Sequence, residues 1–179
     1  MKTLKKAALV TGAILFFVTL VSPTFAQKTA KLSDAEIASV AVVANQNDID
    51  YANIALKKSQ DPKVLEFAKT MISDHQAVID QAVALVTKLK VTPKDNAMSQ
   101  KLTSDAKETM KMLDSKSGKD FDKAYVDNEV TYHKAVINAV KTVLIPDAQN
   151  AELKALLEKV SPILDAHLKH AEMLQKEMK

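Results

Sequence analysis

Three histidines and two acidic residues carry the chemistry that this sequence offers. His75, His133 and His167 each fall on the apolar stripe of a different expected helix, and Asp48 falls on the stripe of a fourth. Glu129 lies four residues before His133 and therefore shares its helix face. Imidazole nitrogens and carboxylate oxygens are ligands for zinc, iron, nickel and copper. Donors on four helices at compatible depths predict a site for one divalent transition-metal ion, or for a small ligand, inside a bundle.

A second explanation of the same residues is structural. A buried neutral histidine commonly bonds to a carboxylate or a hydroxyl group across the core. Asp48, Glu129 and the tyrosines at positions 51, 125 and 132 could supply those partners. We take this as the first hypothesis: a non-enzymatic structural or interaction protein, related to the cell envelope or to stress. Metal or small-ligand binding is its alternative, and a redox enzyme on the same scaffold is the third.

The composition predicts an all-helical fold. The 179 residues contain two glycines and five prolines, fewer turn residues than an all-β domain of this size needs. Helix starts are indicated by a capping box at Ser33–Glu36 and by Asp61 followed by Pro62. Apolar residues recur in alternating steps of three and four, which is the period of a left-handed bundle. Helices are expected over residues 33–59, 61–90, 97–113, 120–144 and 149–179, with Pro162 kinking the last one.

The connections predict how these helices are arranged. Short connections at 59–62 and 145–148 join antiparallel neighbours, and the helix over 97–113 is long enough to cross the length of the bundle. The expected fold is therefore a ferritin-like, up-and-down four-helix bundle with a helical crossover between its second and third helices. Counting residues from the two short connections places Asp48 level with His75 and Glu129 level with His167. The same count places His133 one turn nearer to its connection.

The spacing around the histidines disfavours a di-iron centre. Ferritin-like di-iron proteins carry glutamate three residues before a ligating histidine on two of their helices. Here the corresponding residues are Ile72 and Leu164. Nothing in the sequence resembles a nucleophilic serine motif or a phosphate loop, so no residue is assigned a catalytic role and the protein is not expected to be an enzyme.

The first 26 residues resemble a secretory signal peptide. Lysines open the segment, an apolar run covers residues 7–21, and small residues around Ala26 suit cleavage. We expect a tail over 27–32 and a single domain over 33–179. Cleavage would remove three of the 25 lysines, leaving 22 against 22 acidic residues. The expected product is periplasmic and soluble, without stable membrane insertion.

The absence of two residue types narrows the expected partners further. The chain contains no cysteine, which excludes disulfides, thiolate ligands and a lipidated N-terminal cysteine. It also contains no arginine, the residue best suited to phosphate recognition, so a nucleic-acid partner is not expected. The sequence leaves two kinds of partner open, a protein of the envelope and a second copy of this chain.

Three motifs resemble a bacterial exported family of unknown function. The stretch VLEFAKTMISDH over 64–75 is similar to its VkxFAxxMxxDH signature, FDKAY over 121–125 with His133 to its FDxxY…H stretch, and SPILDAHL over 161–168 to its lPxLxxHL ending. The resemblance covers nearly the whole expected mature chain and implies a ferritin-like bundle with the same three histidines. Members are often labelled predicted outer membrane proteins, but no activity is implied. Where the family usually has glutamate on the first helix, this chain has Asp48 and Asp50.

Overall fold

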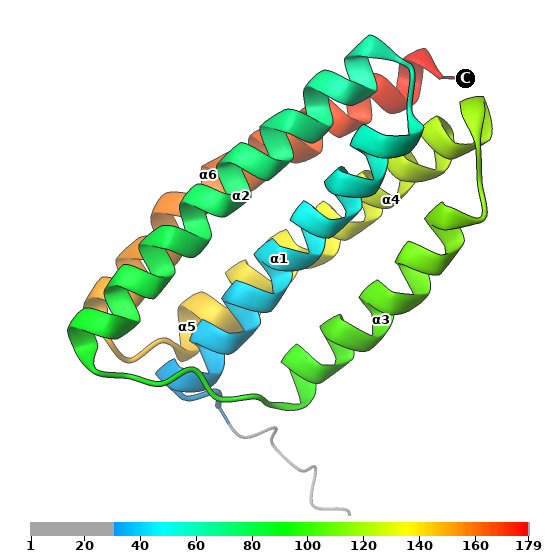
Figure 1. Ribbon diagram of the computed structural model, residues 1–179. Coiled ribbons are helices and arrows are strands. Elements are labelled where there is room, and N and C mark those ends of the chain that lie inside the picture. Colours follow the sequence, from blue (N-terminus) through cyan, green and yellow to red (C-terminus); the bar gives the residue numbers. More distant parts are fainter. Residues whose placement is uncertain (1–30, 179) are drawn as a thin grey trace, which may run out of the picture. The chain divides into compact units, whose positions relative to one another are not determined.

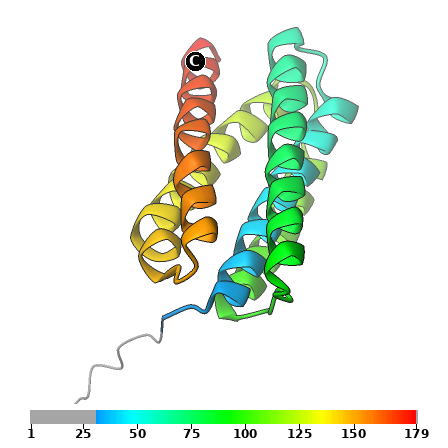
Figure 2. The ribbon, with the colours of Figure 1, turned by 90° about the vertical axis from the view of Figure 1, so that its left-hand side faces the viewer.

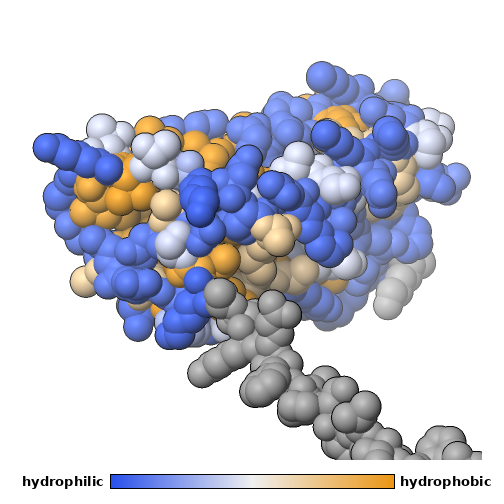
Figure 3. Space-filling model, turned by 90° about the horizontal axis from the view of Figure 1, so that it is seen from below, coloured by the Kyte–Doolittle hydropathy of each residue, from blue (hydrophilic) through white to orange (hydrophobic). Residues whose placement is uncertain are grey.

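The computed structural model describes residues 31–178. The signal-peptide prediction for residues 1–26 lies outside the described residues, as does most of the expected tail. Every regular element between residues 31 and 178 is helical. Over the same range, no helix is both long enough and apolar enough to cross a membrane. Seen from below, the surface is mainly hydrophilic, with apolar patches between the polar side chains (Figure 3).

Four long helices form an up-and-down bundle, and a fifth crosses from one end of it to the other (Figure 1). Around the bundle, α1 packs against α2 and α4, and α6 packs against the same two helices. Viewed from the side, α2 and α6 lie in front of α1 and α4 (Figure 2). The crossover helix α3 packs mainly against α1. The bounds are α1 (Asp34–Lys58), α2 (Pro62–Leu89), α3 (Ala97–Asp114), α4 (Gly118–Ala139) and α6 (Ala151–Glu177). This confirms the fold that the sequence predicts.

The helix starts follow the expected capping chemistry. The Ser33 hydroxyl accepts a hydrogen bond from the Glu36 N–H, and the Glu36 carboxylate accepts one from the Ser33 N–H at 3.0 Å. At the next helix the Asp61 carboxylate accepts from the Lys63 N–H at 2.8 Å, with Pro62 at the first helical position. These caps satisfy amides that have no partner within the helix. They fix the sharp α1–α2 connection and hence the relative depth of the residues on those two helices.

The fourth helix continues further than the sequence indicates. It was expected to stop before Pro146, but a π-helical turn, η1 (Val140–Leu144), and a short helix, α5 (Ile145–Asp147), carry it through the proline. The Ile145 N–H reaches back five residues, to the Val140 carbonyl. Such a wide turn accommodates proline, whose ring would clash with the carbonyl four residues earlier in a regular α-helix. The connection to α6 therefore begins at Ala148, three residues later than expected. Beyond it, α6 runs across Pro162 without a break.

A polar layer separates two apolar halves of the core. One half contains aromatic side chains near the α1–α2 connection, such as Phe67 and Tyr125. The other half is aliphatic and includes Val78 and Leu157. Each of the four bundle helices carries a buried polar residue at the point along its length where its contribution to the aromatic half ends and its contribution to the aliphatic half begins. The layer consists of Asp48, His75, Glu129, His133 and His167, each at most 5% exposed.

Candidate metal centre

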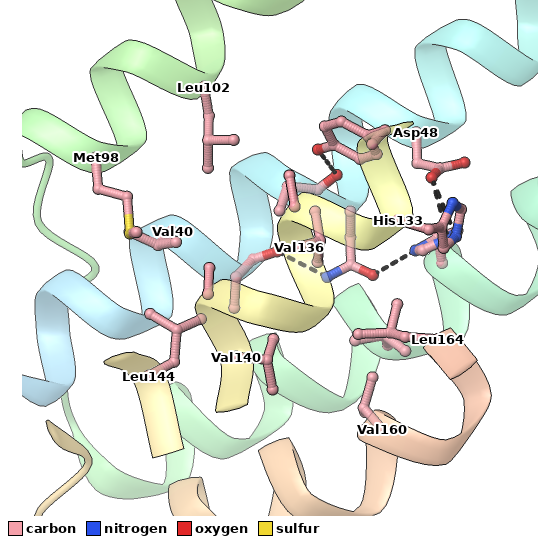
Figure 4. A pocket seen from close by; sticks show the side chains of 18 of the residues that line it. Val40, Asp48, Met98, Leu102, His133, Val136, Val140, Leu144, Val160 and Leu164 are labelled. Carbon is pink, nitrogen blue, oxygen red and sulfur yellow. Dashed lines mark hydrogen bonds and ion pairs between the residues drawn. The ribbon is translucent and has the colours of Figure 1, made fainter. Parts of the chain in front are cut away.

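Each of the four bundle helices contributes one side chain to a central cluster. Asp48 comes from α1, His75 from α2, His133 from α4 and His167 from α6, each from the buried stripe of its helix. The three imidazole rings are mutual neighbours, with centroids 5.1 to 5.7 Å apart. The Asp48 carboxylate points toward the rings (Figure 4). The sequence-predicted residues therefore converge inside the bundle.

The separations in this cluster suit the ligands of a metal ion. Asp48 Oδ2 lies 3.4 Å from His75 Nε2 and 3.6 Å from His133 Nε2. Two donors bound tetrahedrally to one zinc or copper ion at about 2.0–2.2 Å are roughly 3.3–3.6 Å apart. The three histidines can each place one ring nitrogen within 4.8 Å of the others. The arrangement thus needs only small movements to hold one ion.

The His75 ring is held by a hydrogen bond that decides where its proton sits. Its Nδ1 lies 2.7 Å from Asn45 Oδ1. The orientation of the Asn45 amide follows from its other end, because Nδ2 donates to the Ala41 carbonyl at 2.7 Å. An amide oxygen can only accept, so His75 carries its proton on Nδ1. Its Nε2 is then an unprotonated donor atom for a metal.

The other two histidines are held in the same way. His133 Nδ1 donates to the main-chain carbonyl of Glu129 at 3.0 Å, and His167 Nε2 donates to Asp74 Oδ2 at 2.9 Å. The nitrogens that remain are His75 Nε2, His133 Nε2 and His167 Nδ1, and all three are buried without a hydrogen-bond partner. An outer acceptor on one ring nitrogen, with the other nitrogen free, is the arrangement found for metal-ligating histidine.

Burial keeps the three imidazoles neutral. Loss of solvation, aided by the neighbouring histidines, lowers the pKa of His75 to about 2 and that of His133 to about 4. Burial also lowers the pKa of His167, although Asp74 opposes the shift. Neutral imidazole is the form that binds a metal ion. The cluster is therefore in the ligating form at neutral pH.

The two acidic residues are shifted in the opposite direction. Burial raises the pKa of Asp48 to about 8, and burial together with the Asp48 charge raises the pKa of Glu129. Neither Asp48 nor Glu129 has a hydrogen-bond partner for its carboxylate oxygens. Without a cation, the Asp48 carboxyl group holds a proton at neutral pH. A divalent ion would supply the positive charge that their ionised forms lack.

The structure corrects the depth predicted for His133 and Glu129. The sequence count placed Glu129 level with His167, but His133 is the residue beside His167, with ring centroids 5.4 Å apart. The reason is the extension of the helix through Pro146, which moves the connection three residues along the chain. The Glu129 carboxylate instead lies 3.5 Å from His133 Nδ1, the nitrogen that is already hydrogen-bonded. Glu129 forms a second potential ligand group with Asp48 and His133.

Two partners of the cluster were missed from the sequence. Asn45 lies one turn before Asp48, and its amide was not considered. The Asp74 side chain is 42% exposed, yet it reaches His167 on α6. The tyrosines proposed as histidine partners do not serve as such: the Tyr132 hydroxyl, for example, donates to the Ala44 carbonyl. The one sequence feature that could have pointed to Asp74 as a partner of the cluster is its position directly before His75 in the chain.

The fold and the site define an all-helical bundle protein with a buried cluster of histidine and carboxylate groups. The chain belongs to the family described as Domain of unknown function (DUF4142), which matches residues 20–174. This confirms the family of unknown function that the motifs indicated. No curated protein matches the sequence. The chain is similar to a solved structure described as "CopM in the Cu(II)-bound form", with a TM-score of 0.62 and 16% identity over 82% of this chain and 98% of that one. At that identity the likeness shows the fold alone.

Proposed function

We propose that this protein binds one divalent transition-metal ion between its four bundle helices. The ligands are His75, His133 and His167, with Asp48 as the fourth. The observation that carries the proposal is that each histidine has one nitrogen fixed by an outer acceptor and the other buried with no partner. A layer that served only to specify core packing would pair these nitrogens, since an unpaired buried polar atom costs about 1–3 kcal/mol.

The ligand set favours copper(II). Nitrogen and carboxylate donors without any thiolate suit copper(II), zinc and nickel, and affinity among divalent ions is generally highest for copper(II). The similar fold of CopM in its Cu(II)-bound form supports this choice. A di-iron centre is disfavoured because Ile72 and Leu164 stand where the glutamates would be. We further propose that the protein is exported to the periplasm and binds the ion without catalysing a reaction.

Metal titration of the purified mature chain tests the proposal. We expect one copper(II) per chain, with nitrogen hyperfine structure in its electron paramagnetic resonance spectrum, and weaker binding of zinc and nickel. Free metal at 100 times its dissociation constant should stabilise the fold by about 2.7 kcal/mol, measured by thermal unfolding. A chain that binds no copper, zinc or nickel and shows no thermal shift would contradict the proposal.

Removal of the Asp74 carboxylate should weaken metal binding, although Asp74 is not itself a proposed ligand. In the Asp74→Ala variant His167 loses the acceptor that orients its ring, and outer partners of this kind are worth about 10–100-fold in affinity. Because Asp74 is partly exposed, we expect the lower end, about tenfold, by copper titration. Asp80→Ala is the matched control, since Asp80 lies on the same helix and accepts a hydrogen bond from Gln76 instead of from a histidine of the cluster. Equal copper affinity in the Asp74 and Asp80 variants would contradict the role assigned to Asp74.

A further inference from the structure

An apolar cavity lies next to the polar layer, in the aliphatic half of the core. Its volume is about 400 Å³, and its walls come from α1, α2, α3, α4 with η1, and α6 (Figure 4). Side chains from all of these elements line it. Representative lining residues are Val40, Leu102, Val136, Val140, Val160 and Leu164. The cavity is partly open to solvent, since exposed residues such as Lys101 and Thr131 also line it, and its volume far exceeds the voids of ordinary core packing.

The elements around the cavity explain why it is not filled. The crossover helix α3 packs mainly against α1 and covers one side of the cavity with Met98 and Leu102. On another side, the π-helical turn widens the helix at Val140 and Leu144. These irregular parts hold the walls apart where four regular helices would otherwise meet.

One end of the cavity is polar. Asp48, His75 and His133 line it together with the aliphatic residues. Both oxygens of Asp48 and the Nε2 atoms of the two histidines are buried without hydrogen-bond partners. The lining is thus mainly apolar, and the unsatisfied polar atoms of Asp48, His75 and His133 lie close together in it, which is the usual composition of a small-molecule site.

The volume sets the size of the occupant. An apolar cavity of about 150 Å³ holds one benzene ring. By the same ratio, 400 Å³ holds roughly 16 carbon atoms. An aliphatic chain of ten to a dozen carbons with a small head group is within that limit, with no need to displace the core.

We propose that this cavity binds an aliphatic carboxylic acid, with its chain between α1, α3, α4 and α6 and its carboxyl group at Asp48, His75 and His133. In the metal-free protein the acid would bind in its protonated form and donate a hydrogen bond to an unpaired histidine nitrogen. In the loaded protein a carboxylate oxygen would bind the metal ion. The position of the carboxyl group in the loaded protein rests on the metal site proposed above, whereas the position of the chain rests on the cavity itself.

Dodecanoate is the probe, measured by calorimetric titration of the full mature protein with and without copper(II). Ala44 lines the cavity one turn before Asp48, so Ala44→Leu adds a larger side chain inside it. Val136→Phe fills it from α4 and serves as a second variant should the first fold poorly. Ala77→Leu makes the same change as Ala44→Leu at an exposed position of α2. Methyl dodecanoate tests the need for a free carboxyl group.

We expect dodecanoate to bind one molecule per chain and to lose at least tenfold in affinity in either filled variant. The Ala77→Leu control should keep its affinity, the filled variants should keep copper affinity within about threefold, and the methyl ester should bind the loaded protein more weakly than the acid. No binding of dodecanoate, or equal binding by wild type and both filled variants, would overturn the proposal. If the protein takes up no metal but binds dodecanoate in wild type and not in the filled variants, the cavity is supported as the site of the acid. That result would overturn the proposed metal site and leave the cavity proposal standing.

Discussion

Replacement of Asp48 by leucine is expected to stabilise the metal-free protein while it weakens copper binding. Asp48 is fully buried and neither of its oxygens has a hydrogen-bond partner. Removal of an unsatisfied buried polar group recovers about 1–3 kcal/mol, and the adjacent cavity has room for the larger leucine side chain. We therefore expect the free energy of unfolding to rise by that amount in urea denaturation with a chelator present. Copper affinity should fall by at least tenfold.

This result separates the two functions that the sequence left open. If the polar layer existed to specify core packing, Asp48→Leu would destabilise the fold and leave any metal affinity unchanged. If the layer exists to bind an ion, its buried polar side chains lower the stability of the metal-free fold. An apolar replacement of similar size is then neutral or stabilising. Asp50→Leu makes the same chemical change two residues further along α1, where the side chain is partly exposed and bonds to Gln46. It should alter neither property by a comparable amount.

The helical period made the buried positions predictable. Residues spaced by three and four fall on one face of a helix whatever its neighbours are. That rule alone placed Asp48, His75, His133 and His167 inside the bundle. The side chain of Asp48 is shorter than the glutamate that the resembling family usually has on its first helix. In the structure its Oδ2 is nevertheless within 3.6 Å of two histidine nitrogens.

The register between helices was not predictable to the same degree. Depth depends on where a connection begins, and the π-helical turn before Pro146, with the short helix α5 after it, moved that point by three residues. The partners that orient the rings also depend on neighbouring helices, as the contact from Asp74 on α2 to His167 on α6 shows. The cavity is a further property of packing, because it arises from the position of α3 and from the widened turn. None of these features has a periodic pattern in the sequence.

The stability of the metal-free protein is expected to combine two opposing effects of pH, with a net fall above about pH 6.5. The pKa of His75 is lowered to about 2 and that of His133 to about 4, against about 6.5 in the unfolded chain. Below pH 6.5 the unfolded chain therefore binds more protons, so stability falls as the pH falls. The pKa of Asp48 is raised to about 8, against about 4 when unfolded. Between pH 4 and 8 the folded state therefore holds the extra proton, so stability falls as the pH rises.

The two effects oppose each other between about pH 4 and 6.5, so the net dependence on pH is weak there. Above pH 6.5 only the carboxyl groups act, and stability should decline by about 2 kcal/mol between pH 6.5 and 8 from Asp48 alone. Urea denaturation across this range with a chelator measures the curve. A stability that is flat or rising from pH 6.5 to 8 would contradict a protonated Asp48 in the metal-free protein.

Saturation with metal should remove the alkaline decline, because a bound cation favours the ionised carboxylate over its protonated form. Binding at about pH 7 should then release about one proton from Asp48, detectable by titration calorimetry in buffers of different ionisation enthalpy. The three histidines should release none, since burial already keeps them neutral. Proton release of about one in wild type and near zero in Asp48→Leu would identify Asp48 as the group that gives up its proton to the ion. Release that persists in Asp48→Leu would instead assign that role to Glu129, the other carboxyl group whose pKa burial raises.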